Sequence, residues 1–116
     1  MHKALIAATL AGALAAGAVQ ADTLARIKET GAATMGVRES SGALSYRVAE
    51  GEYAGYHVDL CRRVLADVQQ RLNLPRLDIG YRVVSSQNRI SLLLNGSIDI
   101  ECGSTTNSAQ RQKDVA

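Results

Sequence analysis

The sequence has 116 residues, with 13 Lys and Arg against 11 Asp and Glu, which gives a formal net charge of +2. This length allows one domain at most. The charges are dispersed and aromatic residues are rare, with four Tyr and no Phe or Trp, so nothing in the composition indicates nucleic-acid binding.

Residues 1–21 have the pattern of a secretory signal peptide. His2 and Lys3 precede an apolar run over residues 4–18, and Val19 and Ala21 supply the small residues of a cleavage site. The run is shorter than the roughly 20 residues that span a membrane, which favours cleavage after Ala21 over a membrane anchor. We therefore expect an exported mature chain over residues 22–116, whose 12 basic and 11 acidic residues give a net charge of +1.

The first half of the mature chain predicts two helices and three strands. A short helix is expected over residues 22–30, with Leu24 and Ile27 on its apolar face, and a strand over residues 32–37. Strands over residues 44–48 and 52–56 flank a turn and indicate a β-hairpin. A long helix from residue 56 or 57 to residue 72 is predicted from an apolar stripe that comprises Val58, Cys61, Val64, Leu65, Val68 and Leu72.

The second half continues the alternation of helices and strands. A strand is expected over residues 78–85 and a helix over residues 87–94, with Ile90, Leu93 and Leu94 inward. In the next strand Ile98, Ile100 and Cys102 alternate with Asp99 and Glu101, and the last ten residues are expected to begin another helix. The order α-β-β-β-α-β-α-β predicts an α/β fold, with a mainly parallel sheet and helices on both faces.

Cys61 and Cys102 are the two cysteines of the chain. Export to an oxidising compartment would allow a disulfide between them. Both occupy apolar positions of regular elements, so buried free thiols are the favoured interpretation.

Few residues are candidates for catalysis or metal binding. His57, at a helix start, is the one histidine of the mature chain and is interpreted as a surface or capping residue. His57 and the cysteines lack the spacing of metal ligands, and no glycine-rich phosphate or dinucleotide motif is present. We therefore expect no cofactor, no metal and no catalytic residue, and we assign Asp99 and Glu101 structural or solvated roles.

Polar residues cluster at the predicted strand ends and in the loops that follow them. They are Arg38, Ser86, Arg89, Ser104 and Thr106. The carboxyl ends of parallel strands meet at one edge of a sheet, and each guanidinium can hold a carboxylate through two charge-assisted hydrogen bonds. This pattern predicts a site for a dicarboxylate. The alternative is that Arg38 pairs with Glu39 or another surface acid and that Arg89 lies on the outside of a helix.

Four segments carry a resemblance to a known family: VRESS at residues 37–41, GYHVDLC at residues 55–61, SSQNRISLLLNGSIDIECGSTTN at residues 85–107 and RQKDVA at residues 111–116. In these segments the chain resembles the periplasmic solute-binding proteins of polar amino-acid ABC transporters, of the glutamate/aspartate-binding type. The similarity extends from about Leu24 to Ala116. It implies the first lobe of a type II periplasmic-binding-protein fold.

The resemblance also implies a role for each polar residue of the predicted site. Arg89, the arginine of the SQNR motif, would clamp the α-carboxylate of the ligand. Arg38 and Ser86 would bind its acidic side chain, and Ser104 and Thr106 would complete the site. Ser91 stands where the family has a proline, a change of surface type.

Family members have two lobes that close over the ligand, and this chain ends within the first. We therefore expect residues 22–116 to form part of the N-terminal lobe of a monomeric periplasmic receptor. It would bind L-glutamate or L-aspartate for a membrane permease of an ABC transporter. Two alternatives stay open: a truncated remnant that binds nothing, and an enzyme, since the same fold hosts periplasmic dehydratases.

Overall fold

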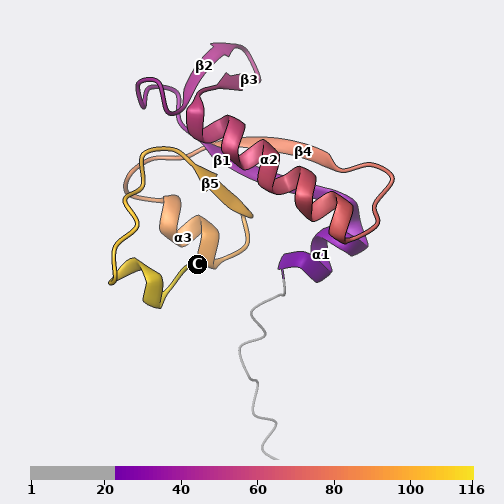
Figure 1. Ribbon diagram of the computed structural model, residues 1–116. Coiled ribbons are helices and arrows are strands. Elements are labelled where there is room, and N and C mark those ends of the chain that lie inside the picture. The colour runs from indigo at the N-terminus through magenta and orange to yellow at the C-terminus, as the bar shows by residue number, and fades with distance from the viewer. Residues whose placement is uncertain (1–22) are drawn as a thin grey trace, which may run out of the picture.

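The computed structural model describes residues 23–116, and its elements follow the predicted order (Figure 1). The predicted signal peptide, residues 1–21, lies outside the described residues. The helices are α1 (Thr23–Thr30), α2 (Tyr56–Arg71), α3 (Arg89–Leu94) and a 3-10 turn, Arg111–Lys113, where the last helix was expected. The strands are β1 (Ala32–Val37), β2 (Tyr46–Ala49), β3 (Glu52–Ala54), β4 (Asp78–Val83) and β5 (Ile100–Cys102). Within residues 23–116, no helix is both long and apolar enough to cross a membrane.

Three strands form one parallel sheet in the order β4-β1-β5, as the alternating helices and strands predict. Val37, at the end of β1, lies opposite Val83 of β4 and Cys102 of β5. The three strands therefore end at one edge. The predicted hairpin, β2 with β3, forms a separate antiparallel ribbon, and every residue of β2 is exposed.

The longest helix, α2, is held at both ends by backbone geometry. Its N-cap is Gly55, with φ of 132°, and a Cβ there would lie only 2.3 Å from the Leu44 carbonyl oxygen. At the other end, Asn73 takes a positive φ of 53° and Pro75 prevents continuation.

The core lies between α2 and the sheet. It consists of buried residues from both layers: Ala33, Met35, Val37, Val58, Cys61 and Leu65, together with Ile27 of α1 and Cys102 of β5. Full burial of an aliphatic side chain contributes about 1.5–3 kcal/mol, so these residues stabilise the fold without Phe or Trp. Val64 is half exposed because it falls at the border of the apolar stripe.

The opposite face of the sheet is only partly covered. Ile98 and Val84 pack over Gly36, where a Cβ would lie 2.6 Å from Ile98 Cδ1 and 3.3 Å from Val84 Cγ1. The prediction that Ile98 shares a face with Ile100 and Cys102 is therefore wrong. β5 begins only at Ile100, because the chain reaches it from the side of the sheet that Gly36 faces.

Helix α3 contacts β5 and is shorter than predicted. Leu94 was expected to point inward but is 53% exposed, whereas Leu92 and Leu93 are partly buried. The helix has only six residues, so its last turn extends past its contact with the sheet. β4 is an edge strand, and most of its residues stay exposed on both faces of the sheet.

Candidate functional site

The carboxyl-end edge of the sheet gathers the loops that carry the predicted polar residues. Arg38 directly follows β1, the loop with Ser86 follows β4, and Gly103 and Ser104 follow β5. Because β1 is the central strand, Arg38 has one of these loops on each side. The parallel topology thus puts Arg38, Ser86 and Ser104 on one edge, as the sequence predicts.

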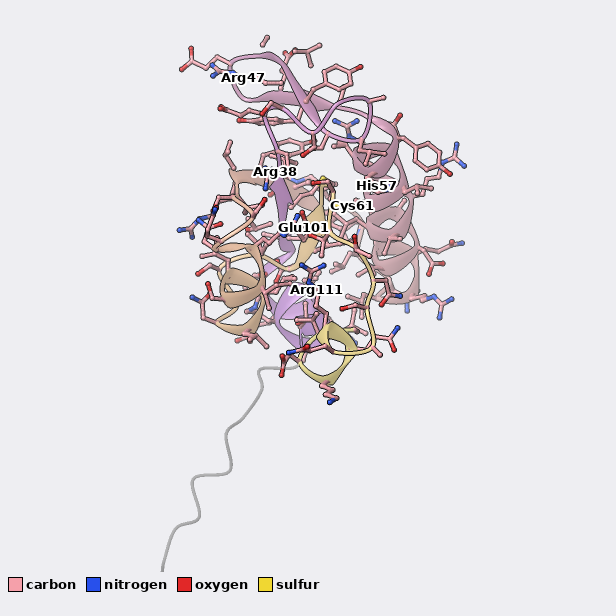
Figure 2. All side chains as sticks on the ribbon, turned by 90° about the vertical axis from the view of Figure 1, so that its left-hand side faces the viewer. Arg38, Arg47, His57, Cys61, Glu101 and Arg111 are labelled. Carbon is pink, nitrogen blue, oxygen red and sulfur yellow. A yellow bond between two sulfur atoms is a disulfide. The ribbon has the colours of Figure 1, made fainter. Side chains whose placement is uncertain are left out.

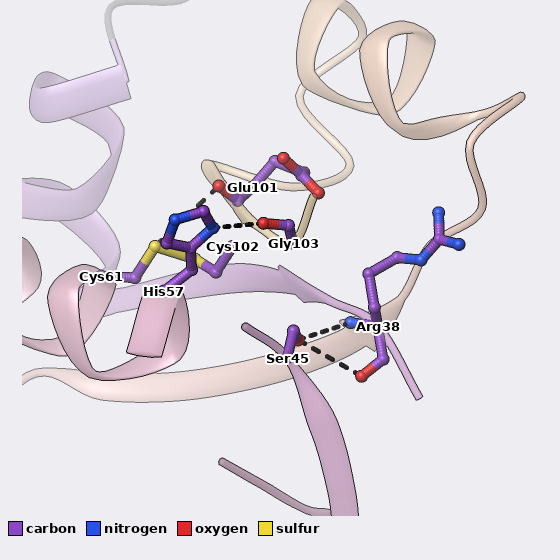
Figure 3. The surroundings of a disulfide bond; sticks show 7 residues. All are labelled: Arg38, Ser45, His57, Cys61, Glu101, Cys102 and Gly103. Atoms are coloured by element: carbon purple, nitrogen blue, oxygen red, sulfur yellow. Dashed lines mark hydrogen bonds between the residues drawn. A yellow bond between two sulfur atoms is a disulfide. The ribbon is translucent and has the colours of Figure 1, made fainter. Parts of the chain in front are cut away.

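Arg38 is held at both its backbone and its side chain. Its N–H donates to Ser45 Oγ at 2.9 Å, and the same hydroxyl donates to the Arg38 carbonyl at 3.3 Å (Figure 3). Its Nη1 donates to Ser86 Oγ at 3.1 Å. Among residues 23–116, Arg38 forms no ion pair with Glu39 or with another acid, and Glu39 pairs with Arg47 at 3.4 Å.

Ser45 contributes to the site although no sequence pattern points to it. Its side chain is completely buried, with a relative exposure of 0%. A buried hydroxyl needs a hydrogen-bond partner, and here the partner is the residue that presents a guanidinium to the edge. The available signal was weak: a single serine between Leu44 and Tyr46 in a strand-like segment.

Arg89 is the first residue of α3 and is buried, with 7% of its surface exposed. Its Nε and Nη1 are buried and have no hydrogen-bond partner among the described residues. An unpaired buried cation costs several kcal/mol unless an anion reaches it. The alternative that Arg89 lies on the outside of a helix is therefore wrong.

The turn before α3 is fixed by a reciprocal pair. Asn88 Oδ1 accepts from the Ser85 N–H at 2.8 Å, and Ser85 Oγ accepts from the Asn88 N–H at 3.2 Å. This reciprocal pairing resembles a capping box, and it closes the turn that leads to Asn88, the N-cap of α3. The helix starts two residues later than predicted because residues 86–88 form the turn.

Ser104 is exposed, and its Oγ accepts from Ser41 Oγ at 3.3 Å. The residue before it, Gly103, is tightly enclosed. A Cβ there would lie 2.5 Å from Glu101 Oε1 and 2.6 Å from Arg38 Cγ. Only glycine lets the chain run this close to Arg38 and place Ser104 at the edge.

Among the described residues, Thr106 makes no hydrogen bond to Arg38, Ser86 or Ser104. Its carbonyl accepts from Arg111 Nη1 at 2.7 Å, and it lines a hollow of about 290 Å³ between α3, β5 and the C-terminal segment. Glu101 and Arg111 line the same hollow, and in Figure 2 Glu101 lies between Arg38 above and Arg111 below. The neighbouring Thr105 Oγ1 is buried without a hydrogen-bond partner among residues 23–116.

Cys61 and Cys102 form a disulfide, with their Cα atoms 6.2 Å apart (Figure 3). The prediction of two free thiols is wrong, although both positions are buried as expected. The reason is packing: the inward face of α2 lies directly on β5, so the two sulfurs meet across 41 residues of sequence.

His57 is half-buried and its Nδ1–H donates to the Gly103 carbonyl oxygen (Figure 3). The position of His57 at a helix start predicts a surface or capping residue and gives no sign of this contact. No spacing rule would have found it, because His57 and Gly103 are 46 residues apart.

Asp99 and Glu101, the two acids near β5, differ in whether their carboxylates have partners among the described residues. Asp99 has the predicted structural role, because it pairs with Arg26 of α1 and accepts from the Thr34 N–H at 2.8 Å. Glu101 Oε1 is instead buried without a hydrogen-bond partner among the described residues. Across residues 23–116, no group of three or more His, Cys, Asp or Glu side chains is arranged to hold a metal ion.

A separate cluster joins the hairpin to the rest of the fold. Arg62 of α2 donates to the Tyr53 carbonyl at 2.7 Å and to Tyr81 Oη at 3.3 Å. The hydrogen bond with Tyr81 raises the pKa of Arg62, so the guanidinium stays charged. These contacts link α2, β3 and β4 and are structural.

Comparison with models of known protein families shows the family to which the chain belongs. The family model for bacterial extracellular solute-binding proteins, family 3, matches residues 33–116. The chain belongs to this family. The match includes all three strands of the main sheet except the first residue of β1.

Two curated relatives have closely similar sequences. The L-glutamate/L-aspartate-binding protein of Pseudomonas aeruginosa is 47% identical, over 96% of this chain and 38% of the relative. The glutamate/aspartate import solute-binding protein of Escherichia coli is 43% identical, over 94% of this chain and 39% of the relative. The chain thus spans less than two-fifths of the length of either relative.

A solved structure shows the same fold. The cysteine-binding protein of Campylobacter jejuni superposes with a TM-score of 0.65 at 24% identity, over 79% of this chain and 36% of that one. The fold is part of a type II periplasmic-binding-protein fold, as the resemblance implied.

Proposed function

We propose that this chain forms part of the ligand-binding lobe of a solute-binding protein that takes L-glutamate or L-aspartate. The observation that carries the proposal is Arg89, which is 7% exposed and has two guanidinium nitrogens without a partner among the described residues. A ligand carboxylate would supply this buried guanidinium with the acceptor oxygens that it lacks among the described residues.

Arg38 supplies a second cation, which differs from Arg89 in exposure and in hydrogen bonding. Its side chain is partly exposed and already donates to Ser86 Oγ, so it can meet a second carboxylate with that hydroxyl beside it. In this proposal Arg89 holds the α-carboxylate, Arg38 and Ser86 hold the acidic side chain, and Ser104 and Thr106 add hydroxyls. The names of the two curated relatives support an acidic amino acid as the ligand.

The wider role follows from the family and the names of its members. We propose that the protein is led to the periplasm by residues 1–21 and delivers its ligand to the membrane permease of an ABC importer. The relatives are named as binding proteins, one of them an import protein, which favours binding over catalysis. Ligand closure would need protein beyond this lobe, since the relatives are more than twice as long.

Isothermal titration calorimetry on the full-length product of the gene that carries this sequence tests the proposal. L-Glutamate, L-aspartate and the matching amides, glutamine and asparagine, are titrated into the wild type, Arg89→Ala and Arg38→Ala. Loss of two charge-assisted hydrogen bonds should weaken binding about 100-fold in Arg89→Ala, for acids and amides alike. Arg38→Ala should mainly reduce the preference for the acid over its amide.

Arg71→Ala is the matched control, because Arg71 is an exposed arginine on α2 that pairs with Asp67, one turn away on the same helix. Its affinity should equal that of the wild type. No binding of either acid by the wild type would support the non-binding remnant instead. Wild-type affinity in Arg89→Ala would overturn the site.

A further inference from the structure

Two residues of α2, one helical turn apart, hold the last residue of β5 and the residue that follows it. His57 and Cys61 are separated by four positions and so lie on the same side of the helix. Cys61 is bonded to Cys102, and the His57 Nδ1–H donates to the carbonyl of Gly103 (Figure 3). The covalent bond fixes the position of residue 102, and the hydrogen bond fixes the direction of the next carbonyl.

The chain passes from buried to exposed between Gly103 and Ser104. Cys102 and Gly103 are buried, and the Gly103 Cα is enclosed by the Glu101 carboxylate and the Arg38 side chain. Ser104 is exposed, and its hydroxyl accepts a hydrogen bond from Ser41 Oγ. Ser104 directly follows the two residues that α2 holds, so its placement at the edge depends on how residues 102 and 103 are held.

We propose that His57 is a positioning residue for the ligand-binding loop. Together with the Cys61–Cys102 disulfide, it keeps the loop ordered in the ligand-free protein, so that Ser104 needs little further ordering when a carboxylate arrives. This inference rests on the proposed function, because it assigns a role in that same site to a residue that does not touch the ligand.

The test compares His57→Ala with His57→Asn in the same full-length protein. The asparagine Nδ2 is attached to Cγ, as is the histidine Nδ1, so it can donate to the Gly103 carbonyl from a similar position. Loss of one hydrogen bond that orders a loop should weaken L-glutamate binding about 5-fold to 10-fold in His57→Ala. His57→Asn should restore affinity to within about 2-fold of the wild type. Gln70→Ala, an exposed change near the far end of α2, is the control.

Amide hydrogen exchange in the absence of ligand separates this inference from the proposed function. In His57→Ala the amides of residues 103–106 should exchange about 5-fold faster, whereas those of β1 should not change. If the wild type binds no acidic amino acid, the proposed function fails, and the exchange data alone decide whether His57 orders the loop.

Two results would overturn the positioning role. One is unchanged exchange in residues 103–106 of His57→Ala, whatever its affinity, because His57 would then not order the loop. The other is faster exchange with wild-type affinity for L-glutamate, because the order of the loop would then not matter for binding. Double replacement of Cys61 and Cys102 by Ser gives a second variant, in which faster exchange of the same residues is also expected.

Discussion

Arg26 and Arg89 both lie beside the central sheet, but their charges are balanced in different ways. Arg26 pairs with Asp99, whose side chain is 3% exposed, and Asp99 also accepts from the Thr34 N–H. Arg89 takes part in none of the ion pairs among residues 23–116, and two of its buried nitrogens have no partner there. Arg26 meets its acid near the start of β5, and Arg89 follows the loop at the carboxyl-end edge.

The difference separates a charge that stabilises the fold from one that is kept ready for a ligand. The Arg26–Asp99 pair joins α1 to the sheet and satisfies a backbone amide as well. Arg89 carries the desolvation cost of burial without a compensating partner in the described residues, which a fold tolerates when binding recovers that cost. Variants at each end of the sheet should therefore affect stability and ligand binding differently.

The largest expected effect comes from the disulfide, which stiffens the carboxyl-end edge without adding charge. Replacing Cys61 and Cys102 together by Ser opens a loop with a sequence separation of 41 residues and should lower the unfolding free energy by about 3–4 kcal/mol. Urea denaturation measures this loss. A dithiol reductant should destabilise the wild type similarly and leave the double variant unchanged. Equal stability of wild type and double variant would contradict the prediction.

Breaking the balanced pair should have the next largest effect. Asp99→Ala removes the partner of Arg26 and leaves the Thr34 N–H unsatisfied, so the unfolding free energy should fall by about 2–3 kcal/mol. Asp67→Ala removes an exposed partner of Arg71 and should change it by less than about 0.5 kcal/mol. If both variants lose the same amount in urea denaturation, Asp99 is not the structural acid described above.

Ser45→Ala tests whether the two hydrogen bonds between Ser45 and the Arg38 backbone position Arg38. Its effect on the unfolding free energy should be smaller than that of Asp99→Ala. Ser45→Ala removes the hydroxyl that accepts from the Arg38 N–H, which should cost about 1–2 kcal/mol of unfolding free energy. The preference for an acidic ligand over its amide should decline as well, because Arg38 is less well placed. The control is Ser91→Ala, because the exposed Ser91 hydroxyl donates locally to the carbonyl of Asn88, the N-cap of α3. Wild-type stability and selectivity in Ser45→Ala would argue against a positioning role for these hydrogen bonds.

Much of the fold was predictable because it depends on short-range patterns. The apolar spacing of Val58, Cys61 and Leu65 predicts the buried face of α2, and the alternation of helices with strands predicts a parallel sheet. The same topology places Arg38, Ser86 and Ser104 on one edge before any side chain is located. The face of Ile98 was not predictable, since it depends on where α3 lies relative to β5.

The contacts that refine the site depend on long-range packing, which short sequence patterns do not encode. The disulfide and the His57–Gly103 hydrogen bond each join residues more than 40 positions apart. The burial of Ser45 and of Arg89 likewise follows from what packs around them. The sequence patterns indicated which residue types lie at the edge, but not which of them already have partners.

Arg89→Met tests the central claim most directly, because the two readouts should change in opposite directions. If Arg89 is a buried cation kept for a ligand, replacing it with an apolar side chain of similar length should raise the unfolding free energy of the ligand-free protein by about 1 kcal/mol. The same variant should lose binding of L-glutamate and L-aspartate in calorimetry. A fall of 2 kcal/mol or more in stability (about the size expected for Asp99→Ala), with ligand binding retained, would contradict the claim and make Arg89 a structural residue.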